Sequence, residues 1–261
     1  MRAFSYAFLF AAALCATACG KDGARAEARA YCTRQSFDGS RFIICDNQGG
    51  EVRLYAAGPG ERPFRSFEEI APTLNVRQVA FAMNAGMFDF DGRPIGLAQA
   101  GGKQVHKINL RDGSGNFHLK PNGVFMVTCG GAPAIFASDA IPSFRCAPRL
   151  ATQSGPMLVI AGKLHPKLQP DGTSRFIRNG VGVRDGRALF VISDDPVSLG
   201  KFARFFRDAL KTSDAVYFDG SVSSLCDPAA GRRDEGAALG PIIVAFRPAE
   251  SKPGPASRAR P

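Results

Sequence analysis

The sequence predicts an α+β fold: a single mixed domain of mainly antiparallel sheet with a few packed helices. Glycine (29 residues) and proline (18 residues) are frequent in this chain of 261 residues, which favours many turns and short strands over helix bundles. Short apolar runs recur along the chain, and only one segment has a long helical period. Residues 31–248 contain no internal repeat and no clear linker, so one domain is the simplest organisation.

The N-terminus has the features of an export signal. Arg2 precedes an apolar run over residues 3–18 that is too short to span a membrane, which predicts a signal peptide over 1–18. Residues 16–19 resemble a bacterial lipobox and predict a lipidated Cys19 that anchors the protein to a membrane. Ordinary cleavage that leaves Cys19 unmodified is the alternative. Export would place the protein at the periplasmic face of a membrane or at the cell surface.

Two terminal segments flank the expected domain. Residues 19–30 are expected to form a flexible tether, and residues 249–261 a basic, proline-rich disordered tail. Between them, strands are expected at 31–35, 41–46, 52–56, 78–83, 95–100, 103–106, 123–128, 156–160, 179–184, 187–193, 215–218 and 242–246.

Two segments are expected to be helical. A capping box from Ser66 to Glu69 starts a helix that Pro72 keeps short. The better-marked helix covers 198–211, where apolar residues recur at helical spacing and Ser198 can cap the first turn. We expect its phenylalanine-rich face to pack against a sheet.

Five cysteines lie outside the export segment, and an exported chain can oxidise them. Cys32 and Cys45 lie on two strand-like runs around a turn signal at 38–40, which predicts the disulfide Cys32–Cys45. The same reasoning applies less strongly to the pair Cys129–Cys146. The cysteine spacings match no zinc pattern, so we expect no metal site and no cofactor, and leave open a divalent cation requirement.

Composition limits the possible functions. The chain contains only three histidines and lacks the motifs of zinc proteases, thioredoxins, α/β-hydrolases, P-loop proteins and Rossmann folds. Its formal net charge of +10 suits an anionic partner such as a phosphate-bearing glycan, or serves only solubility. No basic cluster interleaves with aromatic residues, so nucleic acid is not the expected partner.

Polar turns that directly follow apolar strands are the places where chemistry is expected, because rigid strands position their side chains. Each turn also has a structural interpretation: an Asn-initiated turn, a helix cap or an Asx turn. Two basic residues, Arg178 and Lys120, can meet an anion. The candidates from the turns are Asn84, Gly86, Asp194, Asp219, Gly220, Ser223 and Ser224.

The order of these turns resembles the phosphodiester glycosidase family. The resemblance covers roughly residues 40–246 and implies a mixed α/β domain whose loops form one site that cleaves a sugar from its 1-phosphodiester, so that the substrate is a carbohydrate or sugar phosphate. The motifs are NAGMFD (84–89), RPIGL (93–97), GNFHLKPNGVF (115–125), ATQSGPMLV (151–159), RNGVGV (178–183), ISDDPVS (192–198) and YFDGSVSSL (217–225).

The resemblance also suggests roles. Asp219 and Asp194 would act as the catalytic carboxylate pair, and Arg178, with Lys120 as second candidate, would hold the phosphate. Asn84, Ser223 and Ser224 would bind hydroxyls or phosphate oxygens beside Gly86 and Gly220. Ser221 and Val222 replace two family glycines, which narrows the last turn.

We expect Arg178 and both aspartates to face one common pocket. Two alternatives remain open. The first is a non-catalytic envelope lipoprotein that binds an anionic glycan. The second is a serine hydrolase that uses Ser223 or Ser224, against which the few histidines and the missing nucleophile elbow argue.

Overall fold

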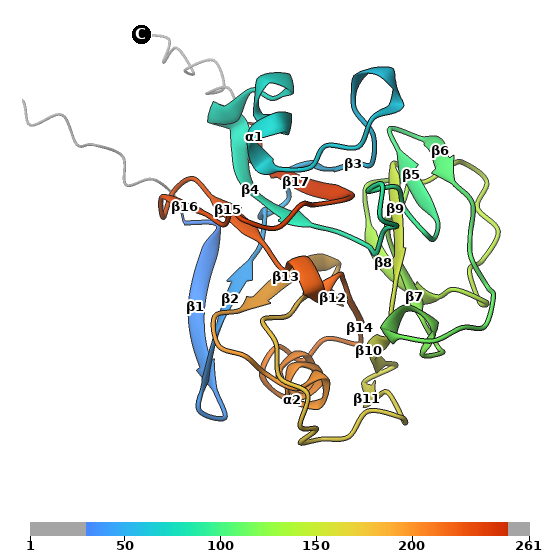
Figure 1. The fold of residues 1–261 in the computed structure, drawn as a ribbon, viewed down its shortest axis with the longest axis vertical. Coiled ribbons are helices and arrows are strands. Elements are labelled where there is room, and N and C mark those ends of the chain that lie inside the picture. The colour runs from blue at the N-terminus through green and yellow to red at the C-terminus, as the bar shows by residue number, and fades with distance from the viewer. Residues whose placement is uncertain (1–29, 250–261) are drawn as a thin grey trace, which may run out of the picture.

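The computed structural model describes residues 30–249 and contains three antiparallel sheets (Figure 1). The first sheet has the order β1-β2-β13-β12-β14-β10-β11, with β1 Cys32–Phe37, β2 Ser40–Cys45, β13 Arg187–Ser193, β12 Asn179–Arg184, β14 Asp214–Tyr217, β10 Met157–Ile160 and β11 Lys163–Leu164.

The second and third sheets have five strands each. The second has the order β16-β15-β4-β17-β3, with β16 Arg232–Arg233, β15 Leu225–Asp227, β4 Val79–Asn84, β17 Ile242–Phe246 and β3 Val52–Tyr55. The third has the order β6-β5-β9-β7-β8, with β6 Lys103–His106, β5 Ala98–Ala100, β9 Leu150–Ser154, β7 Gly123–Val127 and β8 Pro133–Ala137.

The expected antiparallel sheet with a few helices is confirmed, and the protein is mainly β, with less helix than the α+β class implies. The two α-helices are short: α1 spans Phe67–Ile70 and α2 spans Leu199–Arg204. Ser66 and Ser198 cap them as expected, each accepting a backbone N–H three residues on. The helix expected over 198–211 changes at Phe205–Ala209 into a π-helical turn, whose next residue, Leu210, donates its N–H to the Phe205 carbonyl.

All the expected strands form, with small shifts at their ends. Five strands were not expected: β8, β9, β11, β15 and β16. In β9 the cause is clear, because Thr152, Gln153 and Ser154 are polar yet almost fully buried. A buried polar strand has no apolar run by which the sequence reveals it.

One phenylalanine from each sheet meets in the central core. Phe190 of β13 packs against Phe81 of β4, with ring centroids 5.4 Å apart, and against Phe125 of β7, at 5.5 Å. All three side chains are fully buried. A second core lies under α2, where Phe42 stacks on Phe205. Aromatic burial on this scale holds the three sheets in fixed positions relative to one another.

Strands β4, β12 and β13 have their ends at two places in the molecule, the site end and the hairpin end. At the site end, β4 stops at Asn84, β13 stops at Ser193, and β12 begins at Asn179. At the hairpin end, Asp185 and Gly186 turn β12 into β13. Both turn residues have positive φ, as a two-residue hairpin requires.

Both expected disulfides are present. Cys32 and Cys45 face each other in the β1–β2 register and are bonded, and Cys129 is bonded to Cys146. Among the described residues Cys226 alone is unpaired, and burial raises the pKa of its thiol. Cys19 and residues 250–261 lie outside the described residues. No helix within 30–249 has the length and apolar character needed to cross a membrane.

Candidate functional site

Two buried asparagines join the first and second sheets at the site end. Nδ2 of Asn179 donates to Asn84 Oδ1 at 2.8 Å and to the Asn84 carbonyl at 2.9 Å. Asn84 in turn donates from Nδ2 to the Asp219 carbonyl at 2.8 Å and accepts the Ser224 N–H at 2.9 Å. The Asn84 side chain therefore holds both ends of the 219–224 turn, and its amide is fully used inside the protein.

The 219–224 turn carries one carboxylate and three hydroxyls. Asp219 accepts the N–H and the hydroxyl of Ser221 on one oxygen, Oδ1, which forms an Asx turn. The Ser223 hydroxyl donates to the Ile177 carbonyl at 3.1 Å, and the Ser224 hydroxyl donates to the Val222 carbonyl at 2.8 Å. The turn is therefore built from internal hydrogen bonds, and no bond from a described residue reaches the second Asp219 oxygen.

Tyr217, which the sequence analysis treated as part of a buried strand, belongs to the site. Its hydroxyl accepts a hydrogen bond from Arg178 Nη1 at 2.9 Å. The Gly220 backbone lies so close to this hydroxyl that a Cβ at position 220 would collide with it. Burial raises the pKa of Tyr217, the Arg178 charge opposes this rise, and the nearby Asp219 carboxylate adds to it. The phenol is therefore protonated at neutral pH and has a proton to donate.

Arg178 is a buried cation whose partners are neutral. It is 3% exposed. Besides Tyr217, it donates from Nε to the Val197 carbonyl at 2.7 Å and from Nη2 to the Ser174 carbonyl at 3.0 Å. No carboxylate among the described residues forms an ion pair with it. Burial of an unpaired charge is unfavourable, so this position attracts an anion.

The ring of Phe176 lies against the Arg178 guanidinium, 5.5 Å from ring centroid to Cζ. Two backbone hydrogen bonds with Val197 hold Phe176 in place. The side chain is nevertheless 58% exposed, which is unusual for a phenylalanine. An exposed aromatic ring next to the buried cation is thus available to a ligand.

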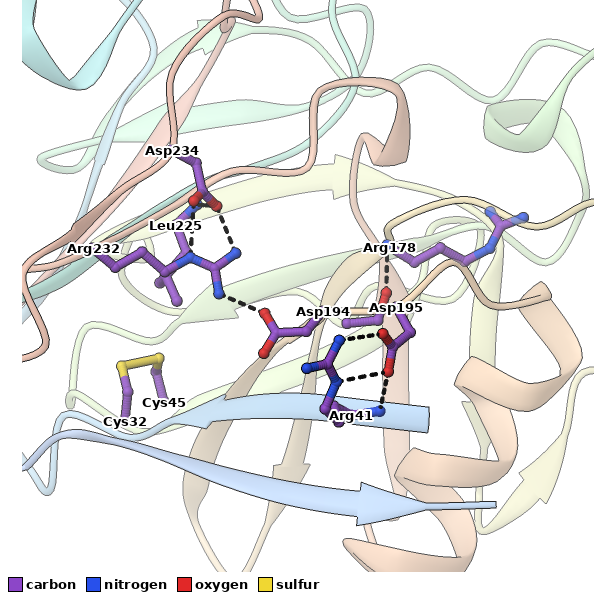
Figure 2. A network of polar contacts seen from close by, with 10 residues as sticks. Cys32, Arg41, Cys45, Arg178, Asp194, Asp195, Leu225, Arg232 and Asp234 are labelled. Atoms are coloured by element: carbon purple, nitrogen blue, oxygen red, sulfur yellow. Dashed lines mark hydrogen bonds and ion pairs between the residues drawn. A yellow bond between two sulfur atoms is a disulfide. The ribbon is translucent and has the colours of Figure 1, made fainter. Parts of the chain in front are cut away.

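Asp194 lies in a different part of the site end (Figure 2). Its Oδ1 accepts a hydrogen bond from Arg232 Nη1 at 2.7 Å, and Arg232 donates two further hydrogen bonds to Asp234. Asp234 accepts the Leu225 N–H at 3.0 Å. Asp194 is therefore held, through two charged residues, to the strand that follows the 219–224 turn.

A cleft of about 460 Å³ opens beside this network, and its walls include Asp194, Ser223 and residues 232–235. Neither Arg178 nor Asp219 lines the cleft, and Figure 2 shows the Arg178 side chain extending away from Asp194. Of the three side chains that were expected to face one common pocket, this cleft contains Asp194. Arg232, which the sequence did not indicate, is the arginine bound to Asp194.

Asp195, next to Asp194, has a structural role. It accepts from the Arg41 side chain and from its backbone N–H, which joins β2 to the end of β13. The hydrogen bonds from Arg41 lower the pKa of Asp195 to about 2. This carboxylate is thus committed to Arg41.

The third sheet contributes a glycine contact and a buried serine. The Gly86 N–H donates to Thr152 Oγ1 at 3.2 Å, and a Cβ on Gly86 would collide with the Gln153 carbonyl. Ser154 projects from the same face of β9 as Thr152, because side chains alternate along a strand. Its hydroxyl is fully buried and makes no hydrogen bond to the protein. A buried hydroxyl without a partner is uncommon, so Ser154 is a further candidate for a functional role, which the sequence did not indicate.

Lys120 is not brought to the other candidates. Its ammonium group donates to the Leu110 carbonyl at 2.6 Å and to Asp112 at 2.7 Å, within a neighbouring loop. Within residues 30–249 no three histidine, cysteine, aspartate or glutamate side chains converge as metal ligands would.

The hydrogen bonds described above join one group of site residues. They are Asn84, Arg178, Asn179, Tyr217, Asp219, Gly220, Ser223 and Ser224.

Comparison with known proteins identifies the family. A family model described as phosphodiester glycosidase matches residues 77–229, which include every turn from Asn84 to Ser224. The chain belongs to the phosphodiester glycosidase family. The chain is also 37% identical over 180 residues to the uncharacterized protein YigE of Escherichia coli K12, an alignment that covers 68% of this chain and 70% of YigE.

Two solved structures share the fold. The zebrafish N-acetylglucosamine-1-phosphodiester alpha-N-acetylglucosaminidase catalytic domain, auto-inhibited by its pro-peptide, superposes with a TM-score of 0.58 at 15% identity, over 83% of this chain and 81% of that one. A hypothetical protein from Synechocystis gives a TM-score of 0.52 at 14% identity, over 83% of this chain and 61% of the other chain.

Proposed function

We propose that this member of the phosphodiester glycosidase family hydrolyses the bond between a sugar and its 1-phosphodiester in a polymer of the cell envelope or an exopolysaccharide. The observation that supports this most is the buried Arg178 cation, which has only neutral partners and is linked through Tyr217 to the turn that carries Asp219. This places an anion-attracting charge and a carboxylate on adjoining groups, as a sugar phosphodiester requires.

The proposed reaction breaks the bond between the anomeric carbon and the phosphate oxygen. The electron pair stays on that oxygen, water adds to the anomeric carbon, and a carboxylate takes the proton that the water loses. The products are a free sugar and a phosphomonoester. A phosphodiester leaves readily, so positioning and charge stabilisation contribute more than acid catalysis.

Arg178 and Tyr217 would act on the leaving group. The phenol accepts from Arg178 and has its own proton free, so it can donate a hydrogen bond to the departing phosphate oxygen. The Arg178 charge behind it strengthens that donation as negative charge develops. Arg178 and Tyr217 are both almost fully buried, so the departing phosphate would lie deep in the site, against the Tyr217 hydroxyl, with the Arg178 charge behind it.

Asp219 and Asp194 would divide the remaining work. Asp219 has one oxygen free of hydrogen bonds from described residues, which suits a group that faces the anomeric carbon. Asp194 is fixed by Arg232 in the cleft that Ser223 also lines, which suits a group that orients water or substrate hydroxyls. The exposed ring of Phe176 offers a stacking face for the sugar.

The zebrafish structure supports the substrate class, because that protein is named for N-acetylglucosamine-1-phosphodiester. A panel of sugar-1-phosphodiesters incubated with purified protein lacking residues 1–20 tests the proposal by release of free sugar. Asp219→Asn should abolish release while its melting temperature stays near that of wild type, because asparagine keeps an oxygen for Ser221. Asp91→Asn, at an exposed aspartate away from the site, is the control.

The second candidate function is glycan binding without turnover. The hydroxyls of Ser223 and Ser224 already serve internal hydrogen bonds, which favours a rigid binding surface over a reactive one. Tight binding of an anionic glycan with no release from any substrate would decide for this function. In either case we propose attachment to a membrane through Cys19, which radiolabelled palmitate should mark in the wild type but not in Cys19→Ser.

A further inference from the structure

A large cavity lies at the hairpin end, opposite the candidate site. Its volume is about 1020 Å³, and its walls come from all three sheets. They include the start of β3, the ends of β7 and β17, and the hairpin between β12 and β13. No residue of the candidate site lines it. A cavity of this size accommodates a ligand as large as a short oligosaccharide.

Four arginines line the cavity, and two of them have no acidic partner. Arg53 pairs with Glu51, and Arg187 pairs with Asp46. Arg149 and Arg247 line the same cavity, and neither forms an ion pair with any described residue. Among the described residues each donates only from Nε, Arg149 to the Cys129 carbonyl and Arg247 to the Val79 carbonyl, and the Arg247 guanidinium also lies over the Tyr31 ring. Their remaining N–H groups are free for an anion.

The backbone of the cavity wall is also open to a ligand. Glycines contribute to three of the surrounding segments, at 49–50, 130–131 and 186. Two of their N–H groups are already used, because Gly50 donates to the Asn47 carbonyl and Gly131 to the Thr128 carbonyl. The N–H groups of Gly49, Gly130 and Gly186 donate to no described residue and can meet a phosphate oxygen. Arginine forks together with accessible backbone donors are the combination that binds phosphate groups.

Each disulfide borders the rim of this cavity through the residue that follows one of its cysteines. Cys45 is followed by Asp46 and Cys129 by Gly130, and both of these neighbours line the wall. Arg149 donates from Nε to the Cys129 carbonyl at 3.1 Å, so the second disulfide fixes the backbone to which Arg149 is bound. A rim held in this way loses little conformational freedom when a ligand binds.

We propose that this cavity is a second binding site of the protein, which takes a phosphate-bearing segment of a glycan polymer. Nucleic acid is less suited, because the described wall offers few stacking faces: Phe246 is buried with Arg53 over its ring, and Tyr55 is half-buried. The inference goes beyond the proposed hydrolysis and does not require it, since binding at this cavity needs no turnover.

The two ends are close enough for one polymer to occupy both. Strand β13 begins at Arg187, which lines the cavity, and ends at Ser193, next to Asp194. Six residue steps along a strand cover about 20 Å, the length of a few sugar units. A polymer bound in the cavity would thus keep a neighbouring repeat near the candidate site and raise its local concentration there.

The test is binding of a short phosphodiester-linked oligosaccharide, measured by calorimetry in the Asp219→Asn background so that no chain is cleaved. Arg149→Gln with Arg247→Gln should weaken binding by at least about tenfold, because two charge-assisted contacts are lost. The matched control is Arg34→Gln with Arg62→Gln, which removes the same charge from residues that neither line the cavity nor form ion pairs. The control should change binding by less than about twofold.

A further pair, Arg149→Lys with Arg247→Lys, keeps the charge, removes the planar fork and should give intermediate binding. Equal weakening by the cavity and control pairs, or no binding to the parent protein, would overturn the proposal. Oligothymidylate of equal phosphate number that binds as tightly as the oligosaccharide would assign the cavity to nucleic acid instead. With Asp219 intact, the cavity pair should hydrolyse a monomeric sugar-1-phosphodiester like wild type. If no substrate is hydrolysed at all, the proposed function fails while the binding result still stands.

Discussion

Arg178 donates a hydrogen bond from Nη1 to the hydroxyl of Tyr217 at 2.9 Å, inside a region that solvent hardly reaches. The bond links a cation that has no acidic partner within residues 30–249 to the phenol that lies against Gly220. A ligand that binds near the 219–224 turn would therefore interact with the Arg178 charge through the Tyr217 side chain.

Tyr217→Phe removes the hydroxyl and leaves the ring in place. We expect the free energy of unfolding to fall by about 1 kcal/mol, since one buried hydrogen bond is lost. Turnover should fall by about 10- to 100-fold, because Arg178 then has no hydroxyl through which to reach the leaving phosphate. Urea denaturation and sugar-release kinetics measure the two effects. Wild-type turnover in a destabilised variant would show that Tyr217 is structural only.

The roles of Asp219 and Asp194 can be distinguished by substitution, because different residues bind the two carboxylates. Asp219→Asn should lower turnover by about 10²- to 10⁴-fold, the range for loss of one catalytic carboxylate. Asp194→Asn leaves Arg232 still bound to Asp234, so the fold should survive and turnover report on Asp194 alone. If Asp194 touches the substrate, Arg232→Gln should cost less activity than Asp194→Asn. Equal losses would make Asp194 a positioning residue.

Gly220→Ala should disrupt the site, because the added methyl collides with the Tyr217 hydroxyl. We expect a large loss of turnover and a clear drop in melting temperature. Adding Tyr217→Phe removes the oxygen that is hit first and should restore part of the stability lost. The check is a double-mutant cycle on melting temperature, and strictly additive effects would contradict the close approach.

Ser154→Ala removes a buried hydroxyl that makes no hydrogen bond to the protein. We therefore expect the free energy of unfolding to stay within about 0.5 kcal/mol of wild type or to rise, because no bond is broken. A fall in kcat/KM at unchanged stability would assign the hydroxyl to the substrate. A marked loss of stability would show instead that the hydroxyl supports the fold.

His165 should make stability depend on pH. The side chain is 1% exposed, its Nδ1 accepts the Lys167 N–H, and its Nε2 makes no hydrogen bond. Burial lowers the pKa of His165 below its ordinary value. As the pH falls below about 6.5, the unfolded chain therefore binds this proton before the folded one does, and the free energy of unfolding decreases.

The variant His165→Asn isolates this effect, because its amide oxygen can still accept the Lys167 N–H. Denaturation curves of wild type and variant between about pH 7 and pH 5 should diverge, with the wild type losing more stability as the pH falls. Parallel curves would mean that His165 becomes charged equally easily in the folded and unfolded chain.

The strands and the turns at their ends could be predicted from the sequence because both have local signals. The run before Asn84 is apolar, and the turn residues Asp185 and Gly186 predict the hairpin of β12 and β13. Helix content could not be predicted as well. The apolar spacing after Ser198 fits an α-helix, but packing of Phe205 onto Phe42 accompanies a change to a π-helical turn that spacing does not reveal.

Some of the site residues could likewise be predicted from the sequence, and others could not. Asn84, Asp219 and Ser224 lie after strands, and their mutual contacts follow from the meeting of the first two sheets. Arg232 lies far along the chain from Asp194, in the short strand β16, which no sequence motif marks, so only the fold shows that they pair. Tyr217 is the exception among the residues missed, since a tyrosine in an apolar strand directly before an aspartate is a signal the sequence does carry.

The meeting of Phe81, Phe125 and Phe190 has a practical consequence for engineering. Because the three sheets are locked together in the interior, the segments that leave their ends, such as 165–176, can be exchanged for those of relatives without rebuilding the scaffold. Chimaeras that keep Asn84 and Asn179 should fold and differ in the sugars they accept. New specificities would then come from grafted loops on an unchanged platform.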